Sequence, residues 1–279
     1  MSSPNNYNYQ YPPPPPAPSH TSSYLPQPQP QPQTFSLRIP TGISGLDPLI
    51  SGGFIKGKTY LVAGETGTCK TLFSLKYIIS GIERNEPCVY VPFDETIDGT
   101  IQGALTLGWD LQTPIENNML RILDVRPFFA EVVREKFMAE VVKKILQELK
   151  HYVEEIHATR LVIDPVAPLL GEGPDVSWNR DFIRGFVTAI ERFLGCTTVI
   201  TSEIPTGSKA LSRFGVEEFL ASGIIILGIR EVGDRVVRTL QIRKMRWTRI
   251  DLNPYVFTIK PLEGIVVEKP LHEYVRELE

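Results

Sequence analysis

Residues 64–71, with the sequence GETGTCKT, combine glycines, a lysine and a threonine at a spacing suited to binding phosphate. Glycines let backbone N–H groups surround an anion without obstruction by a Cβ atom, the lysine reaches the outer phosphates, and the threonine hydroxyl ligates Mg²⁺. The helix expected to follow adds its positive N-terminal end. We therefore expect ATP to be held by Gly64, Glu65, Thr66, Gly67, Thr68, Cys69, Lys70 and Thr71.

Cys69 departs from the G-x-x-x-x-G-K-[ST] pattern, which has glycine at this position. If the residue needs a positive φ, its Cβ atom costs about 1–2 kcal/mol. We expect nucleotide binding to be weakened about tenfold in consequence. A thiol in a phosphate-binding loop is also a candidate for redox sensitivity.

Acidic residues follow two of the apolar runs that we expect to be strands. Asp164 ends the run LVID, and its carboxylate would hold Mg²⁺ together with the Thr71 hydroxyl. Asp94 and Glu95 follow the run CVYVPF, where a carboxylate would polarise the water that attacks the γ-phosphate. The alternative for this pair is a solvated acidic loop.

Strands and helices are expected to alternate along most of the chain. Apolar runs predict strands, and apolar residues at intervals of three and four predict helices. Gly233 and Asp234 separate two such runs and predict a hairpin. The pattern favours an α/β fold with a mostly parallel sheet, helices on both faces and an antiparallel C-terminal edge. The expected strands are residues 61–63, 88–93, 161–163, 197–201, 224–229, 236–242, 256–259 and 265–267, and the expected helices are residues 71–82, 131–156, 180–193 and 216–221.

The composition is ordinary for a globular protein, with 42% hydrophobic and 22% charged residues, a net charge of −3 and a pI of about 5.9. A dedicated DNA-binding domain usually has a basic excess, so this balance gives DNA binding only weak support. Cys69, Cys88 and Cys196 show neither a disulfide pattern nor zinc-ligand spacing. No apolar run is long enough to cross a membrane and no signal peptide is visible, so we expect a cytoplasmic protein.

Residues 1–33 contain no Asp, Glu, Lys or Arg and are rich in proline and glutamine. Such a segment buries too little apolar surface to offset its ordering entropy, so we expect a disordered tail with polyproline II character. The tail is either a solvated appendage or a docking segment for a proline-reading protein partner. We expect residues 34–269 to form an ATPase domain and residues 270–279 a C-terminal extension.

Residues 39–71, IPTGISGLDPLISGGFIKGKTYLVAGETGTCKT, resemble the opening of KaiC-like ATPases of the RecA superfamily. Further similar stretches are FDET, LGWDL, VEEFLASG, REVGDRVVRTLQIRKMR, FTI and GIVV, so the resemblance spans residues 36–268. It implies a RecA-like fold and a homo-oligomeric ring, usually a hexamer, with ATP and Mg²⁺ bound between subunits.

The same resemblance assigns roles to four residues outside the loop. Asp94 and Glu95 match the family's adjacent carboxylates, and the first of them is the water activator. Asp94 replaces the usual Glu, which implies slow turnover. Lys244 and Arg246 match cations that reach the γ-phosphate of a neighbouring subunit and make hydrolysis depend on assembly; the alternative is a solvated strand end. Trp247 stands where the family usually has Gly.

Functions of different classes remain open at this stage. The first is an ATP-binding, slowly hydrolysing ring with a regulatory or signalling role. The second is a RecA paralogue that binds DNA in recombination or repair, although the loop after Asp164 carries no Lys or Arg and the next loop adds only Lys209 and Arg213. A nucleotide-binding scaffold with negligible hydrolysis also fits Cys69 and Asp94.

Overall fold

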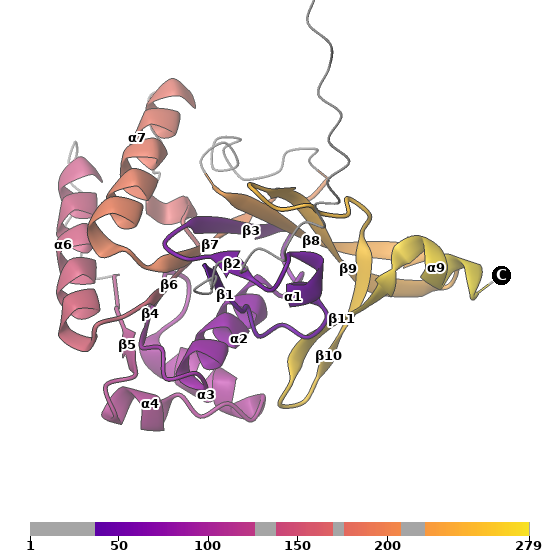
Figure 1. The fold of residues 1–279 in the computed structure, drawn as a ribbon, viewed down its shortest axis with the longest axis horizontal. Coiled ribbons are helices and arrows are strands. Elements are labelled where there is room, and N and C mark those ends of the chain that lie inside the picture. The colour runs from indigo at the N-terminus through magenta and orange to yellow at the C-terminus, as the bar shows by residue number, and fades with distance from the viewer. Residues whose placement is uncertain (1–36, 126–137, 170–175, 208–220, 279) are drawn as a thin grey trace, which may run out of the picture. The chain divides into compact units, whose positions relative to one another are not determined.

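The computed structural model describes residues 37–125, 138–169, 176–207 and 221–278. A sheet of nine strands in the order β11-β10-β9-β8-β3-β7-β6-β4-β5 runs through these residues. The strands from β8 to β5 are parallel, and β9, β10 and β11 extend the sheet in antiparallel fashion. The fold class expected from the sequence is confirmed: the architecture is RecA-like, with a parallel centre and an antiparallel C-terminal edge (Figure 1).

Apolar runs in the sequence predicted all of the parallel strands but one. They are β3 (Thr59–Gly64), β4 (Cys88–Pro92), β5 (Leu120–Ile122), β6 (Arg160–Asp164), β7 (Thr197–Glu203) and β8 (Gly223–Val232). The missed strand, β5, is short and lies at the sheet's edge, so its pattern is weak. The C-terminal strands are β9 (Arg235–Met245), β10 (Tyr255–Lys260) and β11 (Gly264–Pro270). The predicted hairpin joins β8 and β9, and its Gly233 has φ 57.

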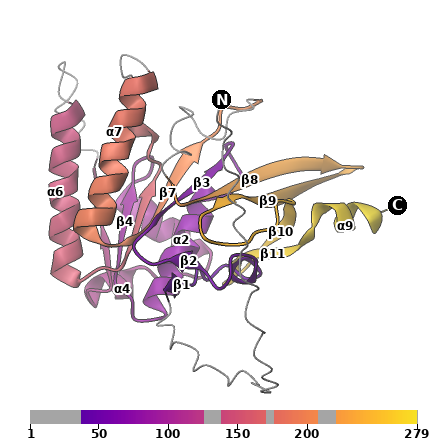
Figure 2. The same ribbon diagram turned by 45° about the horizontal axis from the view of Figure 1, so that its top comes forward.

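Helices cover both faces of the sheet, and the two hydrophobic cores lie between helices and strands. Helices α6 (Met138–Ile156) and α7 (Val176–Ala189) lie side by side on one face (Figures 1 and 2). Their apolar residues, among them Leu149 and Ile183, pack with Leu61 and Leu161 of the strands. Helix α2 (Lys70–Ile82) lies on the other face, and its residues from Phe73 to Gly81 are buried.

Shorter elements complete the described chain. Strands β1 (Arg38–Ile39) and β2 (Phe54–Ile55) form a small separate sheet. A single turn of π-helix (Ile190–Leu194) follows α7, so the helix predicted at 180–193 changes geometry near its end. The remaining helices are α1 (Leu46–Leu49), α3 (Ile97–Thr106), α4 (Gln112–Glu116), the 3₁₀ turn Ala167–Leu169 and α9 (Leu271–Arg276).

Several sequence expectations fall outside the described residues. They are the tail at 1–33, the first part of the helix predicted at 131–156, and all but the last residue of the helix predicted at 216–221. The division of the chain at residues 34, 269 and 270 stays a prediction. Within the last segment, the Leu271 N–H donates to the Pro254 carbonyl at 2.8 Å, which joins the start of α9 to the segment before β10.

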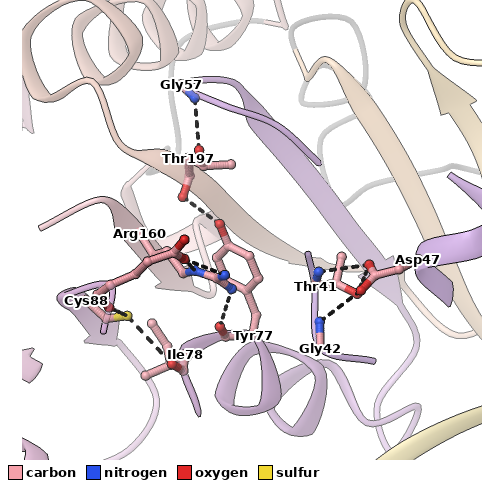
Figure 3. Close-up of polar contacts among 10 residues, drawn as sticks. Thr41, Gly42, Asp47, Gly57, Tyr77, Ile78, Cys88, Arg160 and Thr197 are labelled. Atoms are coloured by element: carbon pink, nitrogen blue, oxygen red, sulfur yellow. Dashed lines mark hydrogen bonds and ion pairs between the residues drawn. The ribbon is translucent and has the colours of Figure 1, made fainter. Parts of the chain in front are cut away.

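The TGISGLD motif at residues 41–47, which carries part of the family resemblance, holds the N-terminal segment in place through hydrogen bonds. Asp47 accepts hydrogen bonds from the backbone N–H and the hydroxyl of Thr41, at 2.8 and 2.7 Å, and from Gly42 N at 3.4 Å (Figure 3). Gly42 has φ 75, and a Cβ atom there would lie 2.2 Å from Ser80 Cβ on α2. The motif therefore folds the N-terminal segment closely against α2.

A buried arginine holds α2 on the sheet. Arg160 is fully buried at the start of β6, pairs with Glu86 at 2.6 Å and donates to the Tyr77 carbonyl at 2.9 Å (Figure 3). Its guanidinium lies 4.6 Å from the centre of the Tyr77 ring, and the Tyr77 hydroxyl donates to the Thr197 carbonyl at 3.0 Å. These contacts fix the position of α2, whose other end begins at the phosphate-binding loop.

Candidate nucleotide-binding site

The loop between β3 and α2 opens into a cleft at the carboxyl ends of the parallel strands. Ligands of open α/β sheets bind at this end, because the strand-to-helix loops gather there. The cleft has a volume of about 370 Å³. Its lining combines the loop with the ends of three other strands: Thr66, Gly67, Cys69, Lys70, Thr71, Asp94, Asp164, Pro165 and Glu203. The structure thus brings most of the predicted phosphate, metal and water-activating residues together in this lining. The predicted residues outside the lining are Gly64, Glu65 and Thr68 of the loop, and Glu95, Lys244 and Arg246.

The loop is folded around its own carbonyl groups. Lys70 Nζ donates to Gly64 O at 2.9 Å and to Glu65 O at 3.0 Å, and the Thr68 hydroxyl donates to Glu65 O at 2.7 Å. A Cβ atom on Gly64 would lie 2.4 Å from that hydroxyl, so glycine is required there. Burial lowers the pKa of Lys70, while the negative charges of Glu203, Asp164 and Asp94 act in the opposite direction.

Cys69 adopts the left-handed conformation that its position in the pattern led us to anticipate. It has φ 77 and ψ 33 and forms the N-cap of α2. Its side chain is half-buried, and this burial raises the pKa of the thiol. The Arg238 guanidinium of β9 opposes that rise through its charge and a hydrogen bond, so β9 approaches the phosphate-binding loop at this point.

Asp164 is buried at the end of β6 and has a donor on each carboxylate oxygen. The Tyr90 hydroxyl donates to Oδ2 at 2.9 Å, and the Thr201 hydroxyl donates to Oδ1 at 2.5 Å. Burial and the neighbouring carboxylate raise the pKa of Tyr90 well above its ordinary value. Sequence reasoning missed Tyr90 and Thr201; the available signal was a hydroxyl inside an apolar strand adjacent to the Asp164 strand.

The arrangement suits Mg²⁺ bound together with a nucleotide. Within the described ranges, no group of three or more His, Cys, Asp or Glu residues could hold a metal ion by itself. Mg²⁺ sites in nucleotide enzymes need only one or two protein ligands, because phosphates and waters supply the rest. Thr71 and Asp164 line the same cleft and fit that requirement.

Asp94 and Glu95 diverge from each other. Both side chains are exposed, but Asp94 lines the cleft, whereas Glu95 turns towards the start of α3. Its Oε1 accepts from Thr96 N at 3.1 Å and lies 2.2 Å from where a Cβ atom on Gly99 would be. Asp94 is therefore the member of the pair that is placed to meet a nucleotide.

Glu203 is a cleft residue that sequence reasoning did not single out. It ends β7, in register with Gly64, and accepts a hydrogen bond from the Thr66 hydroxyl. The Gly207 N–H donates to Glu65 Oε1 at 3.2 Å, which joins the same two segments a second time. The available signal was its place two residues after the strand predicted at 197–201.

Lys244 and Arg246 lie at the other end of the sheet. The Arg246 N–H donates to Ser222 O at 2.8 Å, and the Ser222 N–H donates to Thr59 O at 2.7 Å, so Arg246 is level with the first residue of β3. The phosphate-binding loop follows the last residue of β3, about 16 Å away for five strand rises. Neither cation lines the cleft of its own chain.

Comparison with known proteins agrees with this geometry. A family model described as the KaiC ATPase matches residues 39–272. The chain belongs to the KaiC family. The circadian clock oscillator protein KaiC of Thermostichus vulcanus is 36% identical over 225 residues, which cover 80% of this chain and 42% of that protein. KaiC of Synechococcus elongatus is 34% identical over 225 residues, with the same coverage.

A solved KaiC-like protein from the archaeon Pyrococcus horikoshii OT3 is similar over its whole length. The TM-score is 0.71 at 34% identity, and the match covers 83% of this chain and 98% of that one. By contrast, the chain spans about two fifths of the length of the curated KaiC relatives. Among the described residues, no helix is long and apolar enough to span a membrane.

Proposed function

We propose that this KaiC-family chain binds ATP with Mg²⁺ in the cleft at residues 64–71 and hydrolyses it slowly. The observation that supports this most is the convergence of Lys70, Thr71, Asp94 and Asp164 on one cleft from three separate strand ends. Loop N–H groups would hold the phosphates, and Lys70 would leave the carbonyls of residues 64 and 65 to reach them. Thr71 and Asp164 would hold Mg²⁺, which when bound neutralises phosphate charge.

Asp94 is the proposed group that orients and polarises the attacking water. It faces the cleft, whereas Glu95 does not, so the pair divides into one reacting carboxylate and one that contacts the start of α3. A positioned general base contributes roughly 10²–10⁴-fold to a rate. Asp is one methylene shorter than the Glu usual in the family, so water is held less closely and turnover is low.

The proposed functional unit is a homo-oligomeric ring, hexameric by family resemblance. Lys244 and Arg246 cannot serve the cleft of their own chain from the far end of the sheet, but a neighbouring copy could present them to it. Cations delivered in this way make hydrolysis depend on assembly. Since the curated relatives are described as circadian clock oscillator proteins, we propose a regulatory role in the cytoplasm, with the proline-rich tail as a site for protein partners.

Phosphate release by the full-length protein, measured alongside ATP binding, tests this proposal. Wild type is expected to bind ATP and release phosphate in the presence of Mg²⁺, and Lys70→Ala to lose both. Asp94→Asn is expected to keep ATP binding and lose about 10²-fold or more of the rate. Wild-type phosphate release no faster than that of Lys70→Ala would reduce the protein to a nucleotide-binding scaffold. Absence of ATP binding would reject the function altogether.

DNA binding is the second candidate function, and one surface favours it. A basic hollow at the far end of the sheet carries an exposed tryptophan, a combination that single-stranded nucleic acid can use for phosphate contacts and base stacking. A titration with single-stranded DNA at several salt concentrations tests this candidate. Tight binding that weakens steeply with salt would support a recombination or repair role.

A further inference from the structure

The lining of the nucleotide cleft includes a carboxylate that the proposed chemistry does not use. Asp164 is assigned to Mg²⁺ and Asp94 to the attacking water, whereas Glu203 lines the same cleft and has neither task. A carboxylate beside a phosphate-binding loop disfavours an anionic ligand, because like charges repel each other at short range. The place of Glu203 in this cleft therefore calls for a function of its own.

Glu203 contacts the part of the loop that the outer phosphates of a nucleotide must reach. Its carboxylate accepts a hydrogen bond from the Thr66 hydroxyl. Burial lowers the pKa of Lys70, and among the negative charges that oppose this effect Glu203 comes first, ahead of Asp164 and Asp94. The lysine of a phosphate-binding loop reaches the β- and γ-phosphates. The charge of Glu203 therefore acts where those phosphates would bind.

The main chain around Glu203 is held against the phosphate-binding loop. Glu203 is the last residue of β7 and is in parallel register with Gly64, the last residue of β3. The Ile204 N–H donates to Gly64 O at 3.0 Å, and the Gly207 N–H donates to Glu65 Oε1 at 3.2 Å. A nucleotide must therefore either displace the Glu203 side chain or bind in the presence of its charge.

Asp164 carries the same charge as Glu203 but is held by different donors. Its carboxylate oxygens accept hydrogen bonds from the hydroxyls of Tyr90 and Thr201, which both belong to strands of the sheet. The hydroxyl that Glu203 engages belongs instead to Thr66, within the loop that receives the phosphates. A threonine hydroxyl has one proton to donate, so a phosphate oxygen competes with the Glu203 carboxylate for it.

We propose that Glu203 determines the selectivity of the cleft between nucleoside triphosphates and diphosphates, because its carboxylate repels the terminal phosphate of ATP and competes with it for the Thr66 hydroxyl. The inference rests on the proposed nucleotide function and adds to it the residue that sets the ratio of the ATP and ADP affinities. ATP brings one phosphate more than ADP into the outer part of the cleft, so the penalty falls mainly on ATP. Occupancy of the cleft by ATP then follows the ratio of ATP to ADP in solution.

Replacement of Glu203 by glutamine removes the charge and keeps an oxygen that can accept from the Thr66 hydroxyl. Loss of a unit charge close to the terminal phosphate is expected to raise the affinity for ATP about tenfold and that for ADP less than about twofold. Glu203→Asp keeps the charge and is expected to retain the wild-type ratio of affinities within about twofold. Thr66→Val is the matched control, because it removes the hydrogen bond and leaves the charge of Glu203 in place; its ratio is also expected to stay within about twofold.

The experiment titrates ADP and a non-hydrolysable ATP analogue into the full-length proteins in the presence of Mg²⁺, by isothermal titration calorimetry. The measured quantity is the ratio of the dissociation constant of the analogue to that of ADP, which is expected to fall about fivefold or more in Glu203→Gln. An unchanged ratio in Glu203→Gln would overturn the proposal, as would equal gains in affinity for both nucleotides. A fall of the same size in Glu203→Asp or Thr66→Val would also overturn it, because the charge would then not be the cause.

Phosphate release by the same proteins distinguishes this inference from the proposed function. If wild type binds both nucleotides and releases phosphate while Glu203→Gln keeps the wild-type ratio, the proposed function stands and the inference fails. If both nucleotides bind without phosphate release and the ratio falls in Glu203→Gln as expected, the inference stands and the proposed hydrolysis fails. If neither wild type nor Glu203→Gln binds a nucleotide, both fail.

Discussion

Replacement of Cys69 by glycine tests whether the left-handed backbone at the start of α2 is strained. Cys69 has φ 77 and ψ 33 in the nucleotide-free chain, so any strain is present before a phosphate arrives. Relief of that strain is worth about 1–2 kcal/mol. Glycine also loses about 0.5–1 kcal/mol more backbone entropy on folding. The net expectation is a gain of about 0.5–1 kcal/mol in the free energy of unfolding, or about 1–4 °C in melting temperature for a domain of this size.

The same strain is expected to affect the free energy of unfolding but not the affinity for ATP. Strain that is common to the free and bound states cancels in the dissociation constant, so Cys69→Gly is expected to change ATP affinity less than about threefold. The sequence led us to expect nucleotide binding about tenfold weaker, which assumed that binding imposes the positive φ on Cys69. Thermal unfolding without nucleotide and fluorescence titration with an ATP analogue measure the two quantities.

Cys69→Ala is the matched control, because it removes the thiol but keeps the Cβ atom. Equal melting temperatures for the glycine and alanine variants would refute the strain argument. An alternative result is a roughly tenfold gain in affinity for the glycine variant with unchanged stability. That result would show that the loop is remodelled on binding and that the strain arises only then.

Three further predictions follow from the buried polar contacts and from the position of Arg246. Glu86→Ala leaves the fully buried Arg160 guanidinium without its carboxylate, and we expect a loss of about 3–5 kcal/mol in the free energy of unfolding, measured by urea denaturation. Arg160→Met leaves Glu86 at a partly exposed position, so it should lower the free energy of unfolding by less. A larger loss for Arg160→Met than for Glu86→Ala would contradict the argument. Tyr90→Phe removes a donor from the Asp164 carboxylate and should cost about 1 kcal/mol of stability. It should also raise the Mg²⁺ concentration needed for half-maximal phosphate release, and an unchanged Mg²⁺ dependence would exclude a positioning role for Tyr90. Arg246→Ala should lower kcat more than ATP affinity, since a cation delivered by a neighbour stabilises transferring charge; equal losses in both would count against that delivery.

The fold and most of the cleft could be predicted because their signals are local. The glycines and Lys70 lie within one short run of sequence, and Asp94 and Asp164 each follow an apolar strand directly. In a parallel sheet the carboxyl ends of the strands lie together, so these local signals also imply spatial proximity. The hairpin at Gly233 was similarly visible, because its turn residue needs a positive φ.

The contacts that sequence reasoning missed depend on register between strands that are far apart in the chain. Tyr90 reaches Asp164 because residues 92 and 164 are paired in β4 and β6, and Glu203 reaches the loop because it pairs with Gly64. A one-residue shift in either pairing would turn these side chains to the other face of the sheet. No local pattern fixes that register, which is set by the packing of the two cores.

The antiparallel edge explains why the cleft of one chain lacks its proposed trans-acting cations. Strand β9 returns alongside β8 in the opposite direction, so the chain reaches Arg246 only after it has come back to the level of Thr59. A parallel strand in that place would have carried the same cations towards the phosphate-binding loop. The topology instead separates three carboxylates and Lys70 at one end of the sheet from a basic hollow at the other. In the proposed ring, the antiparallel direction of β9 is therefore the reason that hydrolysis requires a second copy, and it decides which end of the sheet that copy must present.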